Sequence, residues 1–335
     1  MPAETMRAGT VSAEARGAES AGTAIGAETD ADTNAGIAGG PAAPGTAQTF
    51  LRALELSDAE PRLYDLAFEA VPQYVPWPKA YGGDMVAQSA AAMMRSVEAD
   101  RTLHSMHSYF MRPVDIAVPV RYEVELLRDG RGYSTRNVRG FQNGKAVFAA
   151  MGSFQVPEDG PDFQQQAPAA VDPDSVRSAA DVLADIEGPA AEYWRHGRSF
   201  DMRHLPGPVY LEVDGGTAPA QAIWIRAFDA LPDGPDAAAT ADLHRLALAY
   251  VCDYTILEPL LRRNGLHWSS PGLATASLDH SMWFHRDGRL DDWVLYAQEA
   301  VSGQSNRGLA TGRFFDRSGR LLATVAQEGM IRSGT

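Results

Sequence analysis

The chain repeats one order of sequence patterns, and this repeat limits the folds that it can adopt. In the first half, a helical pattern that opens in YGGDMVAQSA (81–90) precedes several long extended runs. In the second half, a helical pattern from about Asp242 to Leu261 precedes runs of the same kind, beginning with ATASLDHSMWFHR (274–286). The same order of elements in both halves indicates a duplicated domain, each copy a helix followed by a long meander.

The extended runs agree between the two copies. GFQNGKAVFAAMGSF (140–154) corresponds to RFFDRSGRLLATVAQEG (313–329), and YFMRP (109–113) to WFHRD (283–287). In the first copy, Asp129-Gly130 and Asn143-Gly144 separate three runs, which predicts long antiparallel strands joined by hairpins. In the second copy, we expect a strand pair over VYLEV (209–213) and AIWIRAF (222–228). The expected class is α+β.

Changes in composition divide the chain into four parts. Residues 1–47 contain Ala, Gly and Thr with few large apolar side chains, which is typical of a disordered tail. Residues 158–195 are polar and rich in proline, and are predicted to form a linker with a short helix around 179–188. The folded units are therefore expected at 48–157 and 196–335.

The charge balance excludes some partners. The formal net charge is −14, which argues against a nucleic-acid partner, because such proteins need a basic face. A ligand that carries phosphates must then be bound by a local basic pocket against the overall field.

The remaining composition indicates a compartment. The single cysteine, Cys252, excludes an intrachain disulfide and is expected to be a small buried side chain. No apolar run reaches the roughly 20 residues of a membrane span. The first residues lack the apolar core of a secretory signal, and the last four, RSGT, are not a peroxisomal address. We therefore expect a cytoplasmic protein.

Asp253 is the most informative position for chemistry. It lies in the predicted second helix, on a stripe of otherwise apolar residues formed by Leu246, Tyr250, Leu257 and Leu260. A carboxylate on an apolar stripe is costly to bury without partners. Two interpretations are open: a structural Asp that binds a nearby strand, or a functional carboxylate that faces a cavity. Pro259 is expected to bend or end this helix.

The segment SLDHSMWFHR (277–286) is predicted to be a strand. Alternation places Ser277, Asp279, Ser281 and Trp283 on one face, and Leu278, His280, Met282 and Phe284 on the other. Ser277 is then a candidate to face the same cavity as Asp253. His280 and His285 fall on opposite faces, so they are expected to be structural or surface residues that share no metal.

Other catalytic signatures are missing from the sequence. There is no G-x-S-x-G nucleophile elbow, no C-x-x-C pair and no glycine-rich phosphate loop. HSMH (104–107) lacks further ligands nearby, so we expect no metal site.

Several motifs together resemble the acyl-CoA thioesterase II (TesB-like) family. They are YGGDMVAQSA, HSMHSYFMRP, RDGRGYSTRNVRGFQNGKAVFAAMGSFQ, LDHSMWFHR and VAQEGMIR, and they cover the chain from about residue 48 to its end. The resemblance implies two tandem hotdog domains, each a long antiparallel β-sheet wrapped around a central α-helix. It also implies an acyl-CoA substrate and a homo-oligomer.

The resemblance further implies a site. Family members hydrolyse fatty acyl-CoA to free fatty acid and CoA, without a cofactor, by a water that an Asp, a Thr or Ser, and a Gln hold. These roles fall on Asp253, Ser277 and Gln327, and not on the conspicuous Asp279. Many members carry Thr where this chain has Ser277. Two roles are open for Gln327: positioning the water, or donating to the oxyanion.

Substrate-binding residues are expected around this set. Gly82 and Gly83 open the first helix, and their N–H groups are candidates to meet an anion or a carbonyl; close helix–sheet packing is the alternative. His107 matches the family's HSYF segment. Arginines are candidate phosphate contacts or, alternatively, surface and fold-stabilising residues: Arg112, Arg286, Arg307 and Arg313.

Two other functions are alternatives to hydrolysis. A non-catalytic hotdog protein that binds acyl-CoA is the alternative, and the intact set of Asp253, Ser277 and Gln327 favours the enzyme over it. Hydration of an enoyl-CoA pairs an Asp with a His five residues later, and Glu258 occupies that position here.

Overall fold

The computed structural model describes residues 45–334, so almost all of the tail predicted at 1–47 lies outside the described residues. Within residues 45–334, thirteen strands form one continuous sheet in the order β1-β2-β4-β5-β6-β3-β10-β13-β12-β11-β8-β7, with β9 paired to β13. Every strand pair in it is antiparallel.

The first half contributes a short helix α1 (Gln48–Ala53), the helix α2 (Gly82–Met94) and six strands: β1 (Ser57–Ala59), β2 (Leu66–Ala70), β3 (Thr102–Phe110), β4 (Val120–Asp129), β5 (Tyr133–Gln142) and β6 (Lys145–Gln155). The two hairpins predicted in this half are confirmed, since β4–β5 and β5–β6 pair along their lengths. Asn143 (φ 50°) and Gly144 (φ 73°) turn the second hairpin in the left-handed region, as a tight two-residue loop requires.

The second half contributes the helices α5 (Ala237–Val251) and α6 (Glu258–Arg263) and seven strands: β7 (Phe200–Leu205), β8 (Ala220–Ala227), β9 (Ala274–Ser277), β10 (Asp279–Phe284), β11 (Val294–Gln304), β12 (Arg307–Asp316) and β13 (Leu321–Arg332). The strand expected at 222–228 is confirmed as β8. The prediction of a strand at 209–213 is wrong, because β8 pairs with β7 and not with this segment. Residues 209 and 210 instead bind a loop, through N–H groups of Trp268 and Ser269.

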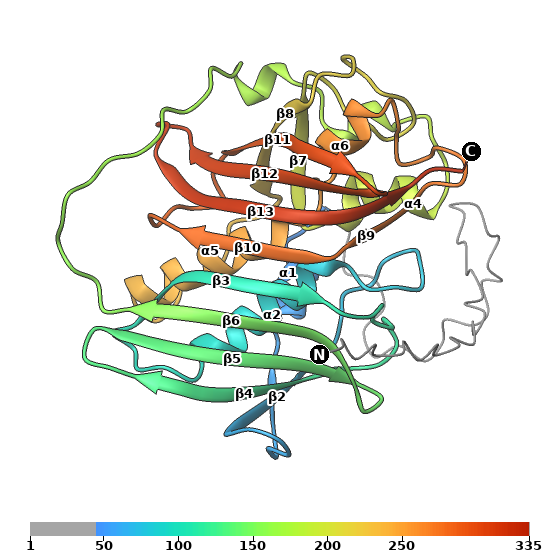
Figure 1. Cartoon of the computed structure of the whole chain (residues 1–335). Coiled ribbons are helices and arrows are strands. Elements are labelled where there is room, and N and C mark those ends of the chain that lie inside the picture. Colours follow the sequence, from blue (N-terminus) through green and yellow to red (C-terminus); the bar gives the residue numbers. More distant parts are fainter. Residues whose placement is uncertain (1–44, 335) are drawn as a thin grey trace, which may run out of the picture.

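Between the halves, short helices interrupt an extended segment: η1 (Pro173–Ser175), α3 (Ala179–Val182), α4 (Pro189–Glu192) and η2 (Tyr193–Gly197). The helix expected around 179–188 is present as α3, which a Ser178–Asp181 capping box begins. In Figure 1 the first part of this segment loops out along one side of the sheet.

The predicted helix from Asp242 to Leu261 is two helices. α5 ends at Val251, residues 252–257 form turns, and α6 begins at Glu258 with Pro259 in its first turn. Proline lacks an N–H and is tolerated there, whereas inside one long helix it would remove a hydrogen bond. The break lets the two helices contact different elements, because α5 packs against α2 whereas α6 packs against β11 and β12.

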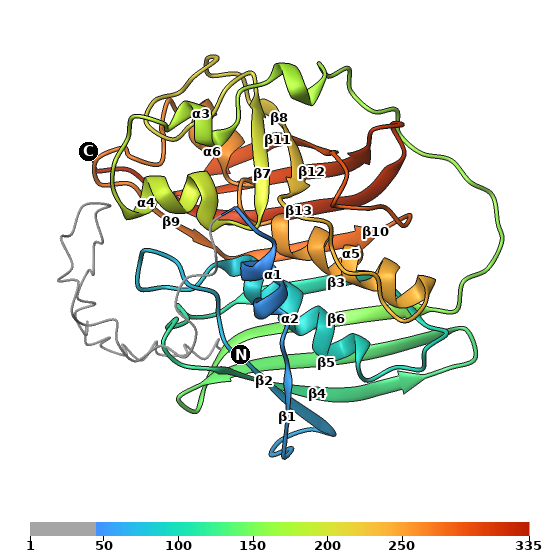
Figure 2. The ribbon, with the colours of Figure 1, turned by 180° about the vertical axis from the view of Figure 1, so that it is seen from behind.

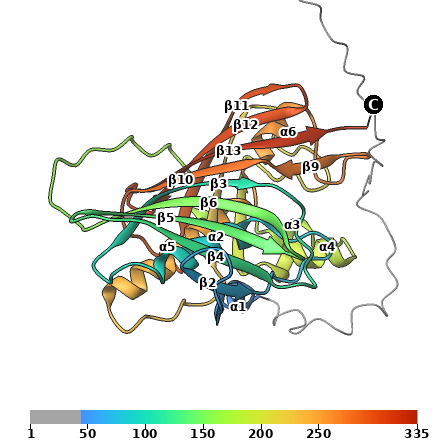
Figure 3. The same cartoon turned by 60° about the horizontal axis from the view of Figure 1, so that its bottom comes forward.

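The helices lie on one face of the sheet (Figures 1 and 2), and the opposite face carries none of them. Seen from below, α1, α2 and α5 lie beneath the curved sheet (Figure 3). One apolar core joins both halves and contains Phe50, Met93, Tyr250 and Val325 among its buried residues. This is the tandem hotdog arrangement that the sequence predicts, a sheet curved around helices twice over; the boundaries 48–157, 158–195 and 196–335 stay predictions.

The halves meet along β3 and β10. These strands pair antiparallel, with Met106 opposite Met282, so the sheet crosses from one half to the other without an edge. The helix α1 also crosses the boundary, because Ser199 Oγ accepts a hydrogen bond from Phe50 N (2.7 Å). Among the described residues, no helix is both long and apolar enough to cross a membrane.

Candidate active site

Asp253 lies in the turn that follows α5, and two side chains of β11 hold that turn. Tyr296 donates to the carbonyl oxygen of Cys252 (3.0 Å), and Gln298 Nε2 donates to Thr255 Oγ1 (2.8 Å). All four groups are buried. Because the turn is bonded on both sides of Asp253, the carboxylate is presented in one direction.

Two side chains converge on this carboxylate. Ser277 Oγ donates to Asp253 Oδ1 (2.9 Å), and Gln327 Nε2 donates to the same oxygen (2.6 Å). Gln327 Nε2 also lies 2.9 Å from Ser277 Oγ. The structure therefore brings together the three residues that the sequence singles out, from the turn after α5, from β9 and from β13.

Ser277 does not share a face with Asp279, Ser281 and Trp283 as predicted. Ser277 pairs with Gly329 of β13, whereas Ser281 pairs with Ala326. The chain therefore advances four residues along β9–β10 while β13 advances only three. The extra residue, Leu278, is a bulge that reverses the alternation. Ser277 therefore points inward like Gln327, while Trp283 points outward and is 38% exposed.

The N-terminus of α2 lies against the other oxygen of Asp253. Tyr81, the N-cap of α2, supplies no side-chain cap, and the Asp253 carboxylate lies against Gly82 instead, where the backbone N–H groups of Gly82 and Gly83 lower its pKa. A Cβ on Gly82 would overlap Asp253 Oδ2, and a Cβ on Gly83 would overlap the carbonyl oxygen of Tyr250. The carboxylate of the second half thus caps the helix of the first half, where the helix dipole favours negative charge.

Burial raises the pKa of Asp253 to about 6, although the hydrogen bonds from Gln327, Ser277, Gly82 and Gly83 act in the opposite direction. A carboxyl with this pKa is mostly ionised at neutral pH and is more basic than an ordinary aspartate. The arrangement can therefore accept a proton from a bound water.

Gln327 has one polar atom without a partner. Its side chain is fully buried, and its Oε1 makes no hydrogen bond to the residues described here. Its Nε2 donates both to Asp253 Oδ1 and to Ser277 Oγ. The remaining carbonyl oxygen is an acceptor that faces no donor of its own.

A second acidic residue, Asp84, lies in the first turn of α2, two residues after Gly82. It is fully buried and accepts hydrogen bonds from Gln73 N (2.9 Å) and Gln73 Nε2 (3.2 Å). Burial raises the pKa of Asp84 to about 8, and the charge of Asp253 adds to this rise. Near pH 7 Asp84 is therefore mostly neutral while Asp253 is mostly ionised, so the two acids do not repel each other.

The aromatic residues around the turn were not predicted from sequence. The Tyr81 ring stacks on Tyr254 (4.0 Å between centroids, 13° between planes), and Tyr81 donates to the carbonyl oxygen of Tyr250 (2.5 Å). The matching YGGD and YVCD segments at 81–84 and 250–253 are the only sequence signal for this contact.

Cys252 and His280 pack together next to Asp253. Cys252 is fully buried, as predicted, and its thiol lies 3.2 Å from His280 Nε2. Burial lowers the pKa of His280 to about 3 and raises the pKa of the thiol. The pair is therefore neutral and serves as packing.

The remaining candidate residues do not join this cluster. His107 lies on the outer face of the sheet, where it binds Ser281 Oγ (3.0 Å). The arginines bind elsewhere: Arg112 to the Ala146 carbonyl, Arg286 to Asp162 and the Leu321 carbonyl, Arg307 to Glu328, and Arg313 to Gln165.

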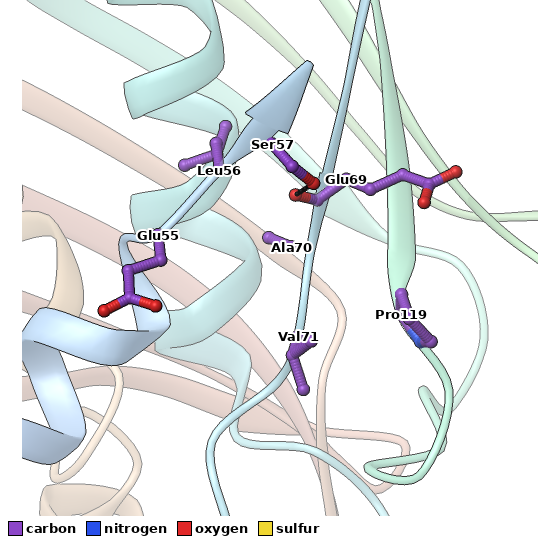
Figure 4. Close-up of a pocket in the computed structure, with 7 residues that line it drawn as sticks. All are labelled: Glu55, Leu56, Ser57, Glu69, Ala70, Val71 and Pro119. Carbon is purple, nitrogen blue, oxygen red and sulfur yellow. Dashed lines mark hydrogen bonds between the residues drawn. The ribbon is translucent and has the colours of Figure 1, made fainter. Parts of the chain in front are cut away.

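Among residues 45–334, no pocket or metal site described below includes the three clustered side chains. A surface pocket of about 320 Å³ lies at the β1–β2 edge and is lined by Glu55, Leu56, Ser57, Glu69, Ala70, Val71 and Pro119 (Figure 4). It includes none of the three clustered side chains. Within residues 45–334, no group of three His, Cys, Asp or Glu residues has the geometry of a metal site.

Comparison with known proteins gives a consistent result. The family model for acyl-CoA thioesterase matches residues 195–330, and the model for its N-terminal domain matches residues 73–155. The chain is 32% identical to acyl-CoA thioesterase 2 of Haemophilus influenzae, over 81% of this chain and 94% of that one. It is 35% identical to acyl-coenzyme A thioesterase 8 of Rattus norvegicus, over 76% and 81%.

A solved structure agrees with these relatives. The acyl-CoA thioesterase II TesB2 from Mycobacterium marinum superposes with a TM-score of 0.67 at 31% identity. The superposition covers 85% of this chain and 97% of that one.

Proposed function

Since the chain belongs to the acyl-CoA thioesterase family, we propose that it hydrolyses fatty acyl-CoA to free fatty acid and CoA by direct attack of a water held by Asp253, Ser277 and Gln327. The chain is an acyl-CoA thioester hydrolase, and the part proposed here is the identity of the fatty acyl substrate, of the water and of these residues. The observation that carries the proposal is the convergence of Ser277 and Gln327 on one oxygen of Asp253.

Asp253 acts as the general base. Its carboxylate takes one proton from the water while the water oxygen bonds to the thioester carbonyl carbon. The tetrahedral intermediate then expels the CoA thiolate, which is a good leaving group because thiols have pKa values near 8.5. The proton on Asp253 returns to the thiolate, and the base is restored without a covalent acyl-enzyme.

Gln327 positions the water in this scheme. Its Nε2 faces Asp253 and Ser277, and its Oε1 is a buried acceptor without a partner among the described residues, so we assign Oε1 to accept a hydrogen bond from the water. This assignment favours water positioning over donation to the oxyanion, the two roles that the sequence leaves open.

The test is the release of free CoA thiol from acyl-CoAs of short to long chain. Asp253→Asn removes the base and keeps the shape, so we expect activity to fall about a hundredfold or more. Asp279→Asn is the matched control, because Asp279 lies on the outer face and its Oδ1 acceptor for Glu328 N is kept. Wild type that binds acyl-CoA without releasing thiol would instead support the non-catalytic binding protein.

A further inference from the structure

A single lysine lies beside the strand that carries Ser277. Lys79 stands in the loop that leads from β2 to α2, and its Nζ donates to the carbonyl oxygen of Thr275 in β9 (3.0 Å). The backbone of the loop is fixed at the same place, because Lys79 forms a β-bridge with Asp115, and Ala80 N donates to the Val114 carbonyl oxygen (2.7 Å). The first half thus places a cation on the second half.

This cation lies close to the clustered side chains. Thr275 and Ser277 are two residues apart on one strand, which separates them by roughly 6.6 Å. Along its own chain, Lys79 is three residues before Gly82, which lies against the Asp253 carboxylate. Lys79 itself is exposed, whereas Gln327 is fully buried. It therefore marks the rim of the site, and not its reacting centre.

The charge of Lys79 is not neutralised by a carboxylate. Its partner is a main-chain carbonyl, and among residues 45–334 no Asp or Glu forms an ion pair with it. Two of the arginines considered as phosphate contacts, Arg286 and Arg307, are already paired with Asp162 and Glu328. In a chain of net charge −14, an unpaired cation at the rim is the local attraction that a polyanionic ligand needs.

Lys79 also differs from most basic residues of the chain in being a lysine and not an arginine. Of the 29 basic residues only Lys79 and Lys145 are lysines. Arginine prefers planar two-point contacts, whereas the lysine ammonium is a compact charge with three rotatable donors. One N–H of the Lys79 ammonium binds the Thr275 carbonyl oxygen, so two N–H groups remain for an anionic ligand.

We propose that Lys79 binds a phosphate group of the CoA part of the substrate, an inference that rests on the proposed function. The phosphates lie at the far end of the pantetheine arm from the thioester. A group that binds them must therefore stand outside the buried cluster, on the rim where Lys79 is. The contact stabilises substrate and transition state equally, so it acts on KM and leaves kcat unchanged.

Kinetics with shortened substrates test this contact. For Lys79→Gln we expect KM for acyl-CoA to rise about tenfold, as for loss of one charge-assisted hydrogen bond, with kcat unchanged. With the matching acyl-pantetheine, which has no phosphate, variant and wild type should have equal KM. An acyl-dephospho-CoA then separates the 3′-phosphate from the diphosphate. Lys145→Gln, at the start of β6, is the control and should change neither constant.

An equal rise in KM for acyl-CoA and acyl-pantetheine would overturn the proposal, because it would mean that Lys79 only tethers the loop to β9. Unchanged KM for both substrates would overturn it too. A second readout does not need turnover: desulfo-CoA should protect Lys79, and not Lys145, from acylation by an activated ester, as measured by mass spectrometry. Failure of wild type to hydrolyse any thioester would count against the proposed function, while this protection would still decide the role of Lys79.

Discussion

At the scale of single residues, the site depends on how one carboxylate oxygen is shared. Asp253 Oδ1 accepts hydrogen bonds from both Ser277 and Gln327, while the backbone N–H groups of Gly82 and Gly83 at the start of α2 also lower the pKa of the carboxyl. Each donor stabilises the ionised form and lowers the pKa that burial has raised. The pKa of Asp253 therefore depends on the opposing effects of burial and hydrogen bonding, and a single substitution can change it.

This balance predicts the pH dependence of hydrolysis. In the proposed mechanism Asp253 must be ionised, so kcat/KM should rise about tenfold per pH unit below pH 6 and level off above it, following the pKa of about 6. Gln327→Leu removes a donor that favours the carboxylate, so the midpoint should move to higher pH, in addition to a loss of rate. Measured profiles with the same midpoint in both proteins would contradict this account of Asp253.

The residue types of the site were predictable, but the direction of Ser277 was not. Alternation alone put Ser277 on the face of Trp283, because an unbroken strand keeps one period. The bulge at Leu278 depends on how β13 pairs with β9 and β10, which is a long-range property. The resemblance named Ser277, whereas only the register explains why it points inward.

At the scale of elements, the N-terminus of α2 is the part of the site with the least room. Gly82→Ala should raise helix propensity, yet its Cβ would overlap the Asp253 carboxylate. We expect a loss of activity of about a hundredfold, on the scale of a displaced catalytic group, with the fold retained by circular dichroism. Gly160→Ala is the control, because no atom lies within 4 Å of its Cβ position. Full activity of Gly82→Ala would show that the carboxylate tolerates displacement.

Elements were predictable where local signals decide them. The Asn143-Gly144 turn sets its hairpin through two residues in the left-handed region, and such pairs are visible in sequence. The helix around Asp253 was predicted too long, because its apolar period continues through 252–257. Tertiary contacts end α5. From β11, Tyr296 donates a hydrogen bond to the Cys252 carbonyl oxygen, and Gln298 donates one to Thr255.

At the scale of the whole molecule, the β3–β10 pairing joins the halves independently of the chain that connects them. A protease site inserted after Gly160, in an exposed segment without helix or strand, should be cut without loss of thioesterase activity. The two fragments should elute together in size-exclusion chromatography. Separation of the fragments in native buffer would show that the connection, and not the shared sheet, holds the halves together.

Covalent connection nevertheless changes how the site assembles. Asp253 belongs to one half and the helix end that binds it to the other, so a site built from two separate chains would form by a second-order reaction and vanish on dilution. In one chain the same encounter is first order, because the linker sets a constant effective concentration of each half around the other. Specific activity should then be independent of enzyme concentration, down to the lowest amount that an assay detects.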